Sequence, residues 1–400
     1  MDLLTISPNG IYPPYDGGAL RVFNLCKELS KKHNIFLFSQ GLRQHELKKL
    51  WQLKKQPELR INGHFTEYRY INFTSIINHQ ILRKAVKNIP DLFAGKALEY
   101  FRPKALIEHL SNCSVIQVEM PWQFDVVSKI KPEHTPIILD QHDLQFELLC
   151  QNMCWDSYFG RKLINYALNI EQNALENADA VFVTSYENKE KLIKTKKCPN
   201  SKIHIIPNGV DIDSYTPTSN SDRTKYKKAL GIHGKYVVLF TGSKHPPNIQ
   251  AVNEIIKMAK NCKNKDILFL VGGSIGDLYT NQDNLQFTGY TEDISTLFKS
   301  ADIAINPMKS GSGTNLKMLE YLAAGLPTIT TKIGGRGLEI IENQTAIISE
   351  IDGFLDYIEL IKSDRQLADN LCRHGREWVE ENYDWRKIAE KQNKIIQSLI

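Results

Sequence analysis

Residues 306–320 read Asn-Pro-Met-Lys-Ser-Gly-Ser-Gly-Thr-Asn-Leu-Lys-Met-Leu-Glu. The stretch follows a predicted strand, Ile303–Asn306, passes through a Gly/Ser turn and enters a helix that we expect to start near Thr314. Gly325 and Pro327 predict the end of this helix. The apolar face of the helix comprises Leu316, Leu319 and Ala323. A strand, a tight turn and a helix in this order are typical of α/β folds with parallel sheets.

The Gly/Ser turn predicts an anion site. Gly311 and Gly313 allow the backbone to approach a phosphate closely. The first amides of the helix have no partner within the helix, and the helix dipole favours negative charge there. The candidate phosphate ligands at this turn are Gly313, Thr314, Asn315 and Leu316.

Glu320 and Lys317 extend this candidate site along the helix. Glu320 is six residues past Thr314, which places it about 9 Å up the helix. A nucleotide with its phosphate at the helix start could therefore place its ribose hydroxyls on Glu320. Lys317 shares a face with Glu320 and could reach the phosphate. The alternative is a surface Lys–Glu pair contributing roughly 0.3–0.5 kcal/mol.

The rest of the chain repeats the strand–helix alternation in two similar halves. The stretch Asp211–Arg223 is rich in Asp, Ser, Thr, Asn and Pro and predicts a surface connection between them. We expect an N-terminal domain at residues 1–212 and a second one from residue 213, both doubly wound and facing a cleft. Ligands of such sheets bind beyond the carboxyl ends of the strands. The predicted strands are Asp2–Ser7, Asn34–Ser39, Val115–Val118, Pro136–Leu139, Ala180–Thr184, Ile203–Ile206, Tyr236–Thr241, Ile267–Val271, Leu285–Phe287, Ile303–Asn306 and Thr328–Thr331.

Two glycine-containing turns follow strands of this set. After Tyr236–Thr241, Gly242 permits close backbone approach and Ser243 and Lys244 offer donors. After the first strand, Gly17 and Gly18 precede a predicted helix and suit contact with a phosphate or a sugar. Each could equally be a plain turn. The spacing is not GxGxxG, which disfavours dinucleotide binding of the usual kind.

His142 and Glu119 follow two other predicted strands. His142 lies in Asp140-Gln141-His142-Asp143, where a polar side chain would face a cleft. Its imidazole could bind a sugar hydroxyl or share in proton transfer, or it could be a capping or surface histidine. Glu119 follows Val115–Val118 and is a candidate acceptor ligand on its position alone.

Length, charge and missing motifs narrow the function classes. A chain of 400 residues exceeds one hydrophobic core, and no apolar run is long enough to span a bilayer or form a signal peptide. Seven scattered cysteines fit a reduced, cytoplasmic protein. HExxH and P-loop motifs are missing from the sequence, so we expect no metal and no cofactor.

The charge excess is local. Residues 41–110 carry a surplus of seven positive charges, thirteen Lys/Arg minus six Asp/Glu. This range is either a solvated surface or a contact for an anionic membrane. The sequence contains no nucleic-acid-binding module of interleaved aromatic and basic residues, so we do not expect nucleic acid as a partner.

Taken together, these segments resemble retaining glycosyltransferases of family GT4, which have the GT-B fold. The resemblance covers most of the chain. Its markers are Gly17-Gly18, Asp140–Asp143, Ile206–Asp211, Phe240–Asn248, Phe287–Tyr290, Gly311–Pro327 and the closing Asn382–Trp385. The resemblance implies an α/β chain of two Rossmann-like domains facing a cleft. It also implies a C-terminal segment, residues 379–400, whose helix crosses back onto the N-terminal domain, so that the second domain spans residues 213–378.

The same resemblance assigns roles to the candidate residues. The donor diphosphate would bind between Gly17-Gly18 and Gly313–Leu316, with Glu320 on the ribose and the backbone near Tyr290 close to the base. His142 matches a family histidine near the donor sugar and the reaction centre. The N-terminal domain would hold the acceptor.

The sequence departs from the family pattern at two places. The first Glu of the EX7E motif would fall at position 312, which is Ser312, and a related subgroup that also lacks it has Arg where Asn315 stands. The Arg/Lys pair that commonly binds the diphosphate after the Gly242 strand is replaced by Ser243 and a Pro-rich turn. Lys317, with Lys244, is the candidate substitute.

The resemblance therefore implies a metal-independent, retaining hexosyltransferase. It would transfer a sugar from a nucleotide-sugar, with UDP- and GDP-sugars as first candidates, to a glycan or lipid-linked acceptor in polysaccharide or glycoconjugate synthesis. We expect it in the cytoplasm, with residues 41–110 as a possible contact to the inner membrane face. The alternatives are a sugar-nucleotide epimerase of the same fold and a degenerate, non-catalytic subunit.

Overall fold

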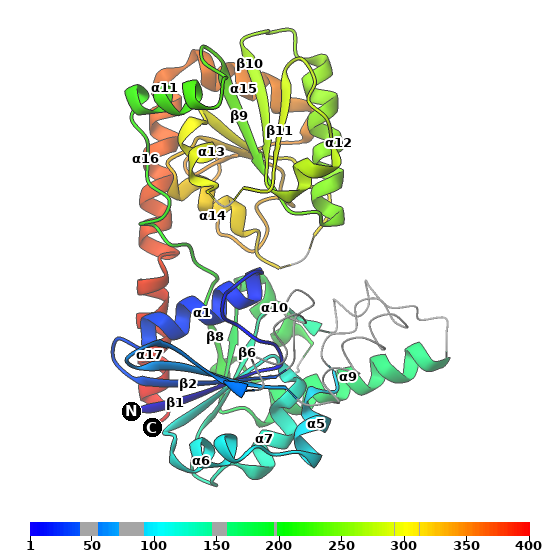
Figure 1. Cartoon of the computed structure of the whole chain (residues 1–400). Helices are drawn as coiled ribbons and strands as arrows, with labels where there is room; N and C mark the ends of the chain where they lie inside the picture. Colours follow the sequence, from blue (N-terminus) through cyan, green and yellow to red (C-terminus); the bar gives the residue numbers. More distant parts are fainter. Residues whose placement is uncertain (41–54, 72–91, 146–157, 196–197, 292, 312) are drawn as a thin grey trace. The chain divides into compact units, whose positions relative to one another are not determined.

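A computed structural model describes residues 1–40, 55–71, 92–145, 158–195, 198–291, 293–311 and 313–400 (Figure 1). The chain forms two compact units. The N-terminal unit comprises Met1–Pro207 and Ile388–Ile400, and the C-terminal unit comprises Asn208–Lys387. Ser312 and much of the basic range, residues 41–54 and 72–91, lie outside the described residues.

The N-terminal unit contains a sheet in the order β3-β4-β2-β1-β5-β6-β7-β8. All neighbours are parallel except the antiparallel pair β3–β4. The chain turns from β1 to β2 on one side and continues to β5 on the other, so the topological switch point lies between β1 and β5. The strands are β1 (Asp2–Ser7), β2 (Asn34–Gln40), β3 (Glu58–Asn62), β4 (Phe65–Tyr70), β5 (Val115–Glu119), β6 (Ile137–Gln141), β7 (Ala180–Val183) and β8 (Ile203–Ile205).

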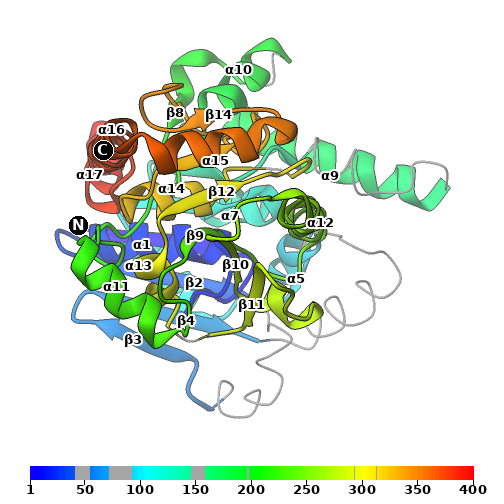
Figure 2. The same cartoon turned by 90° about the horizontal axis from the view of Figure 1, so that it is seen from above.

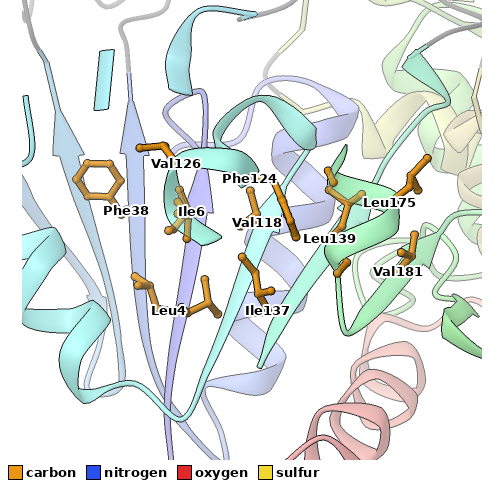
Figure 3. Packing of buried hydrophobic residues seen from close by; sticks show 14 of the residues in the cluster. Leu4, Ile6, Phe38, Val118, Phe124, Val126, Ile137, Leu139, Leu175 and Val181 are labelled. Atoms are coloured by element: carbon orange, nitrogen blue, oxygen red, sulfur yellow. The ribbon is translucent and has the colours of Figure 1, made fainter. Parts of the chain in front are cut away.

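Helices cover both faces of this sheet. One face carries the main core, in which Leu4 and Ile6 of β1 and Ile116 and Val118 of β5 pack with residues of α5, α6, α7 and α9 (Figure 3). The helical elements of this unit are α1 (Gly17–Leu29), α5 (Ala94–Tyr100), α6 (Lys104–Asn112), η3 (Pro121–Gln123), α7 (Phe124–Ile130), α9 (Tyr158–Asn177), α10 (Tyr186–Lys194) and η4 (Asn200–Lys202).

The end of the chain packs against the N-terminal unit. Residues 388–400, most of α17 (Trp385–Ser398), belong to this unit. Gln392 Nε2 donates to Gln117 Oε1 on β5 at 2.8 Å, and Asn393 Oδ1 lies 2.6 Å from His33 Nε2. Because Gln117 alternates with Ile116 and Val118 along the strand, α17 covers the face opposite the main core.

The C-terminal unit contains a wholly parallel sheet in the order β11-β10-β9-β12-β13-β14, with its switch point between β9 and β12. The core on one face includes residues of α12 and α15, and that on the other includes residues of α13 and α14. Figure 2 shows α12 and α13 on opposite sides of β9 and β10. The strands are β9 (Tyr236–Thr241), β10 (Ile267–Gly272), β11 (Leu285–Gly289), β12 (Ile303–Asn306), β13 (Thr328–Thr330) and β14 (Ile347–Ile348). The helical elements are α11 (Asn220–Ala229), α12 (Pro246–Asn261), η5 (Ser274–Leu278), α13 (Ser295–Ser300), α14 (Leu316–Ala323), η6 (Ile351–Gly353), α15 (Phe354–Ser363) and α16 (Arg365–Asn382).

The α/β class and the alternation of strands and helices on both faces agree with the sequence analysis. The hairpin β3–β4 was not predicted, although Asn62-Gly63 is a common hairpin turn. Within the described residues, we find no helix long and apolar enough to cross a membrane.

Candidate functional site

The loop after β1 is held by a buried carboxylate. Glu67, on β4, is fully buried; its Oε1 accepts the Ile11 N–H at 2.8 Å and its Oε2 accepts the Tyr12 N–H at 2.9 Å. Arg69 Nη2 donates to the Tyr12 carbonyl at 2.6 Å. Glu67 and Arg69 both belong to the basic range 41–110, yet both are buried inside the protein. They fix the segment that leads to Gly17 and Gly18.

The start of α1 brings Gly18 beside His142. Asp16 caps the helix through the Ala19 N–H at 2.9 Å. A Cβ built on Gly18 would lie 3.4 Å from His142 Nδ1, so a larger residue there would press on the imidazole. The glycine turn after β1 and the histidine after β6 therefore form one cluster beyond the carboxyl ends of the strands.

Arg21 and Asp140 form a buried ion pair beneath this cluster. Arg21 Nη2 and Nε lie 2.9 and 3.1 Å from the two Asp140 oxygens, and Nη1 donates to the Pro207 carbonyl at 3.0 Å. Arg21 is 1% exposed and Asp140 is 0% exposed. The two-pronged geometry satisfies the carboxylate that precedes His142 by two residues.

Glu119 holds His142. His142 Nε2 lies 2.7 Å from Glu119 Oε2, while Gln117 Nε2 donates to Glu119 Oε1 at 2.6 Å. Glu119 is 1% exposed. From its sequence position, Glu119 was expected to contact the acceptor. Because both of its oxygens are hydrogen-bonded and almost none of its surface is exposed, it is better placed to orient His142.

Burial and charge oppose each other at this pair. Burial lowers the pKa of His142, but the hydrogen bond to Glu119 and the negative charges of Asp140 and Glu119 outweigh it, so the pKa lies above its ordinary value. Burial and the Asp140 charge raise the pKa of Glu119, against the lowering effect of His142. The pair thus shifts the His142 imidazole toward its protonated form.

Glu119, Asp140 and His142 also have the composition of a metal site. One ligand atom of each lies within 4.8 Å of the others. However, the Asp140 carboxylate already accepts from Arg21, and Glu119 already binds His142. A cation would have to displace Arg21, so the cluster fits a charge-paired hydrogen-bond network better than a ligand set.

In the C-terminal unit, the turn after β9 is packed by Asn248. A Cβ on Gly242 would lie 3.1 Å from the Asn248 side chain, whose Nδ2 donates to the Ser243 carbonyl at 3.0 Å. Lys244 pairs with Asp277 at 2.9 Å, and Asp277 Oδ1 also accepts the Tyr290 N–H at 3.1 Å. The Lys244 hydrogen bond is the main reason that the pKa of Asp277 lies below its ordinary value. Lys244 and Tyr290, from separate loops, are therefore joined through one carboxylate.

The start of α14 carries polar groups without a partner. The helix begins at Leu316, with Asn315 as N-cap in extended conformation and no side-chain capping bond. Asn315 is 6% exposed. Its Nδ2 and the Thr314 Oγ1 are buried without a hydrogen-bond partner among the described residues. Unsatisfied polar atoms at a helix N-terminus indicate that a ligand can complete the site.

Burial moves the pKa values of Lys317 and Glu320 toward neutral pH. Lys317 Nζ donates to Asn248 Oδ1 at 2.8 Å and lies 4.1 Å from the centre of the Phe240 ring. Burial lowers its pKa to about 7. Burial raises the pKa of Glu320 to about 7, against the hydrogen bond from Tyr215. Lys317 thus pairs with Asn248 rather than forming the surface ion pair with Glu320 that the sequence left open.

Sequence reasoning did not single out several of these residues. Long-range partners were missed in both units: Arg21 in the N-terminal unit, and Asn248, Tyr215 and Asp277 in the C-terminal unit. A cation one turn into the helix after Gly17-Gly18 was a weak signal for Arg21.

Two family models and several known proteins match the chain. Residues 235–372 match the model described as Glycosyl transferases group 1, and residues 15–214 match Glycosyltransferase Family 4. The putative glycosyltransferase YtcC of Bacillus subtilis is 24% identical over 334 residues, covering 76% of this chain and 77% of that protein.

A further relative is the Escherichia coli UDP-Gal:alpha-D-GlcNAc-diphosphoundecaprenol alpha-1,3-galactosyltransferase. It is 30% identical over 185 residues, or 42% of this chain, and the match spans less than half, 45%, of that enzyme. The crystal structure of Anabaena Alr3699/HepE with UDP-glucose superimposes with a TM-score of 0.68 and 16% identity, covering 99% of both chains.

The structural likeness gives the chain the GT-B fold of glycosyltransferases. The Glycosyltransferase Family 4 match, residues 15–214, spans half of the 400-residue chain. The chain therefore belongs to glycosyltransferase family 4.

Proposed function

We propose that the protein transfers a sugar from a nucleotide-sugar to a hydroxyl of a glycan or lipid-linked acceptor. UDP- and GDP-sugars are the first candidates for the donor. The proposal rests on the start of α14, where the Asn315 amide and the Thr314 hydroxyl are buried and have no hydrogen-bond partner in the described part of the chain. Lys317 and Glu320 follow on the same helix. Amides and a cation at a helix N-terminus suit a diphosphate, and a carboxylate further along the helix suits ribose hydroxyls. The Anabaena protein whose fold matches binds UDP-glucose.

Their contacts support roles for the remaining candidate residues. The backbone of Gly313, Thr314 and Leu316 would bind the diphosphate, as would Gly17 and Gly18 in the N-terminal unit. The Gly242–Lys244 turn and Tyr290, joined through Asp277, would border the nucleotide. His142, oriented by Glu119, would act at the donor sugar and the reaction centre.

The proposal extends to the course of the reaction. We propose transfer with retention of the anomeric configuration and without a metal. Lys317 and the amides at the start of α14 would supply the positive field that a leaving diphosphate needs. Arg21 occupies the carboxylate that a cation in the N-terminal cluster would require.

A lipid-linked acceptor would bring the enzyme to the cytoplasmic membrane face. The relative from Escherichia coli acts on a diphosphoundecaprenol substrate. Tyr100 and Phe101 are 77% and 53% exposed at the end of α5, directly before Arg102 and Lys104. Exposed aromatic and basic side chains together suit the headgroup region of an anionic membrane. Binding to phosphatidylglycerol vesicles, lost in Tyr100→Ser/Phe101→Ser, would support this extension; no binding at low salt would refute it.

A thermal-shift screen tests the donor site. The panel holds UDP-, GDP-, ADP- and CMP-sugars and the free diphosphates. A ligand at 100 times its Kd stabilises the native state by about 2.7 kcal/mol. We expect one nucleotide family to raise the melting temperature, and Glu320→Ala to abolish the shift because the ribose hydroxyls lose their acceptor.

The matched control is Glu342→Ala, an exposed glutamate of the same unit, which should keep the shift. If no nucleotide shifts the wild-type protein at millimolar concentration, the donor site is refuted and the non-catalytic alternative gains support. Turnover of a nucleotide-sugar without any acceptor, giving an epimeric sugar, would favour the epimerase alternative.

A further inference from the structure

Arg336 lies in the loop that follows β13, a part of the chain with no role in the site described so far. A Cβ built on Gly337, which has a φ of +74°, would lie 3.0 Å from Thr314 Oγ1. This backbone conformation suits glycine. The loop after β13 therefore packs directly on the turn before α14, although the two are separated by the whole helix in sequence.

The Arg336 guanidinium reaches the same turn. A Cβ on Gly311 would lie 2.4 Å from Arg336 Nη2 and 2.9 Å from Nη1, so the guanidinium lies against the bare Cα of Gly311. Nη1 also donates to the Ile333 carbonyl at 2.9 Å, which fixes the orientation of the group. The side chain is half-buried. Gly311 thus makes room for a cation beside the glycine turn.

Electrostatics place Arg336 within reach of Lys317. Burial is the main cause of the lowered pKa of Lys317, and the positive charge of Arg336 lowers it further, while Glu320 acts in the opposite direction. Lys317 also contacts the Phe240 ring and the Asn248 amide, neither of which is charged. Lys317 and Arg336 therefore act on one another in a partly dehydrated region that also contains the Glu320 carboxylate. An anion bound there would relieve their repulsion.

We infer that Arg336, together with Lys317, binds the diphosphate of the nucleotide-sugar; the inference rests on the proposed function. The planar guanidinium offers parallel donors that match two phosphate oxygens, whereas Lys317 acts as a point charge. Arg336 enters the site from the loop after β13, and Lys317 enters from α14. The diphosphate would bind at the turn between them, on the unsatisfied groups of Thr314 and Asn315.

Calorimetric titration with UDP, GDP and ADP, each beside its monophosphate, tests this role. Arg336→Gln removes the charge and nearly keeps the volume. We expect it to weaken the binding of the diphosphate by about tenfold or more, and that of the monophosphate by less. Arg336→Lys should recover part of the loss. The control Arg365→Gln changes an exposed arginine of α16 and should bind like the wild-type protein.

A second readout separates binding from mere support of the loop. Because Arg336 lowers the pKa of Lys317, its removal should raise that pKa and move the alkaline decline of diphosphate binding to higher pH. If Arg336 only supported the loop, its removal would leave the pH of this alkaline decline unchanged. If Arg336→Gln does not fold, Arg336→Lys tests the inference in its place. This variant keeps the charge but loses the paired donors, which should weaken diphosphate binding by about threefold.

The outcomes distinguish the two proposals. A wild-type protein that binds none of the three diphosphates refutes the donor site and this inference together. A wild-type protein that binds one of them, with Arg336→Gln unchanged in both affinity and pH dependence, refutes the role of Arg336 alone.

Discussion

The two units treat their buried charges in opposite ways. In the N-terminal unit, Arg21 neutralises Asp140 and Glu119 binds His142, so each charged group beyond the strands has a protein partner. In the C-terminal unit, Lys317 contacts an amide and an aromatic ring, and Thr314 and Asn315 keep buried polar atoms without hydrogen-bond partners among the described residues. The charged groups of the first cluster are paired within the protein, whereas we propose that an anionic ligand completes the second. The predictions below separate the two kinds of site.

The largest effect is expected at His142. His142→Ala should lower turnover of the donor found in the panel by about 10²–10⁴-fold, while UDP or GDP affinity stays within about twofold because the charged groups proposed for the diphosphate, Lys317 and Arg336, lie in the other unit. The exposed His134→Ala of the same unit is the control. Unchanged turnover would remove His142 from the reaction.

A variant of its partner refines this test. Glu119→Gln removes the carboxylate that raises the pKa of His142. If the protonated imidazole acts in the reaction, turnover should decline at lower pH in Glu119→Gln than in the wild-type protein. An unshifted pH profile would leave Glu119 with only a packing role.

Breaking the ion pair beneath His142 should destabilise the N-terminal unit. Asp140→Ala leaves Arg21 buried without its carboxylate, at a cost of about 3–5 kcal/mol. The double variant Arg21→Met/Asp140→Leu removes both charges and should recover most of this loss. Urea unfolding measures the change, with Lys104→Ala, from a pair whose lysine is 90% exposed, as the control. A loss below 1 kcal/mol would contradict the idea that this cluster depends on its internal pairing.

The pH dependence of donor binding should come from the C-terminal unit. Lys317, with a pKa of about 7 in the free protein, must be protonated to attract the diphosphate. Affinity for a nucleotide-sugar, whose diphosphate does not titrate in this range, should therefore decline above pH 7 by up to about tenfold per pH unit. Glu320, with a pKa also of about 7, adds a decline at lower pH where its carboxylate is protonated.

Variants separate the two limbs of this profile. Lys317→Met should remove the alkaline decline and weaken binding, and Glu320→Gln should remove the acidic one. A flat profile between pH 6 and 8.5 in the wild-type protein would show that neither group changes its charge on binding.

Local sequence signals explain what could be predicted. The alternation of apolar strands and helical patterns gave both sheets, and the glycine turns marked the carboxyl ends where the candidate residues lie. The helix expected near Thr314 begins at Leu316, because Asn315 takes the extended conformation of an N-cap. The antiparallel β3–β4 pair was missed because its strands lie in the range interpreted by charge alone.

Pairings between residues far apart in the sequence explain what could not be predicted. Arg21 and Asp140 are 119 residues apart, and no local pattern says which carboxylate a buried arginine meets. Arg69 counts toward the basic surplus of residues 41–110 but lies buried with Glu67. A count of charged residues along a sequence therefore overstates how many of them reach the surface, although this pair leaves the net surplus unchanged.

The smallest effect is expected at Lys244, a charged group of the C-terminal site that forms an ion pair with Asp277. Lys244 and Asp277 are 47% and 40% exposed, so water and salt screen their ion pair. Lys244→Ala should change the free energy of unfolding by less than about 1 kcal/mol and donor affinity by only about two- to threefold. Calorimetry at low and high salt measures both the change and its screening. A loss of donor affinity as large as that of Lys317→Met would place Lys244 on the diphosphate. A charged group that is paired within the free protein could then still bind the ligand.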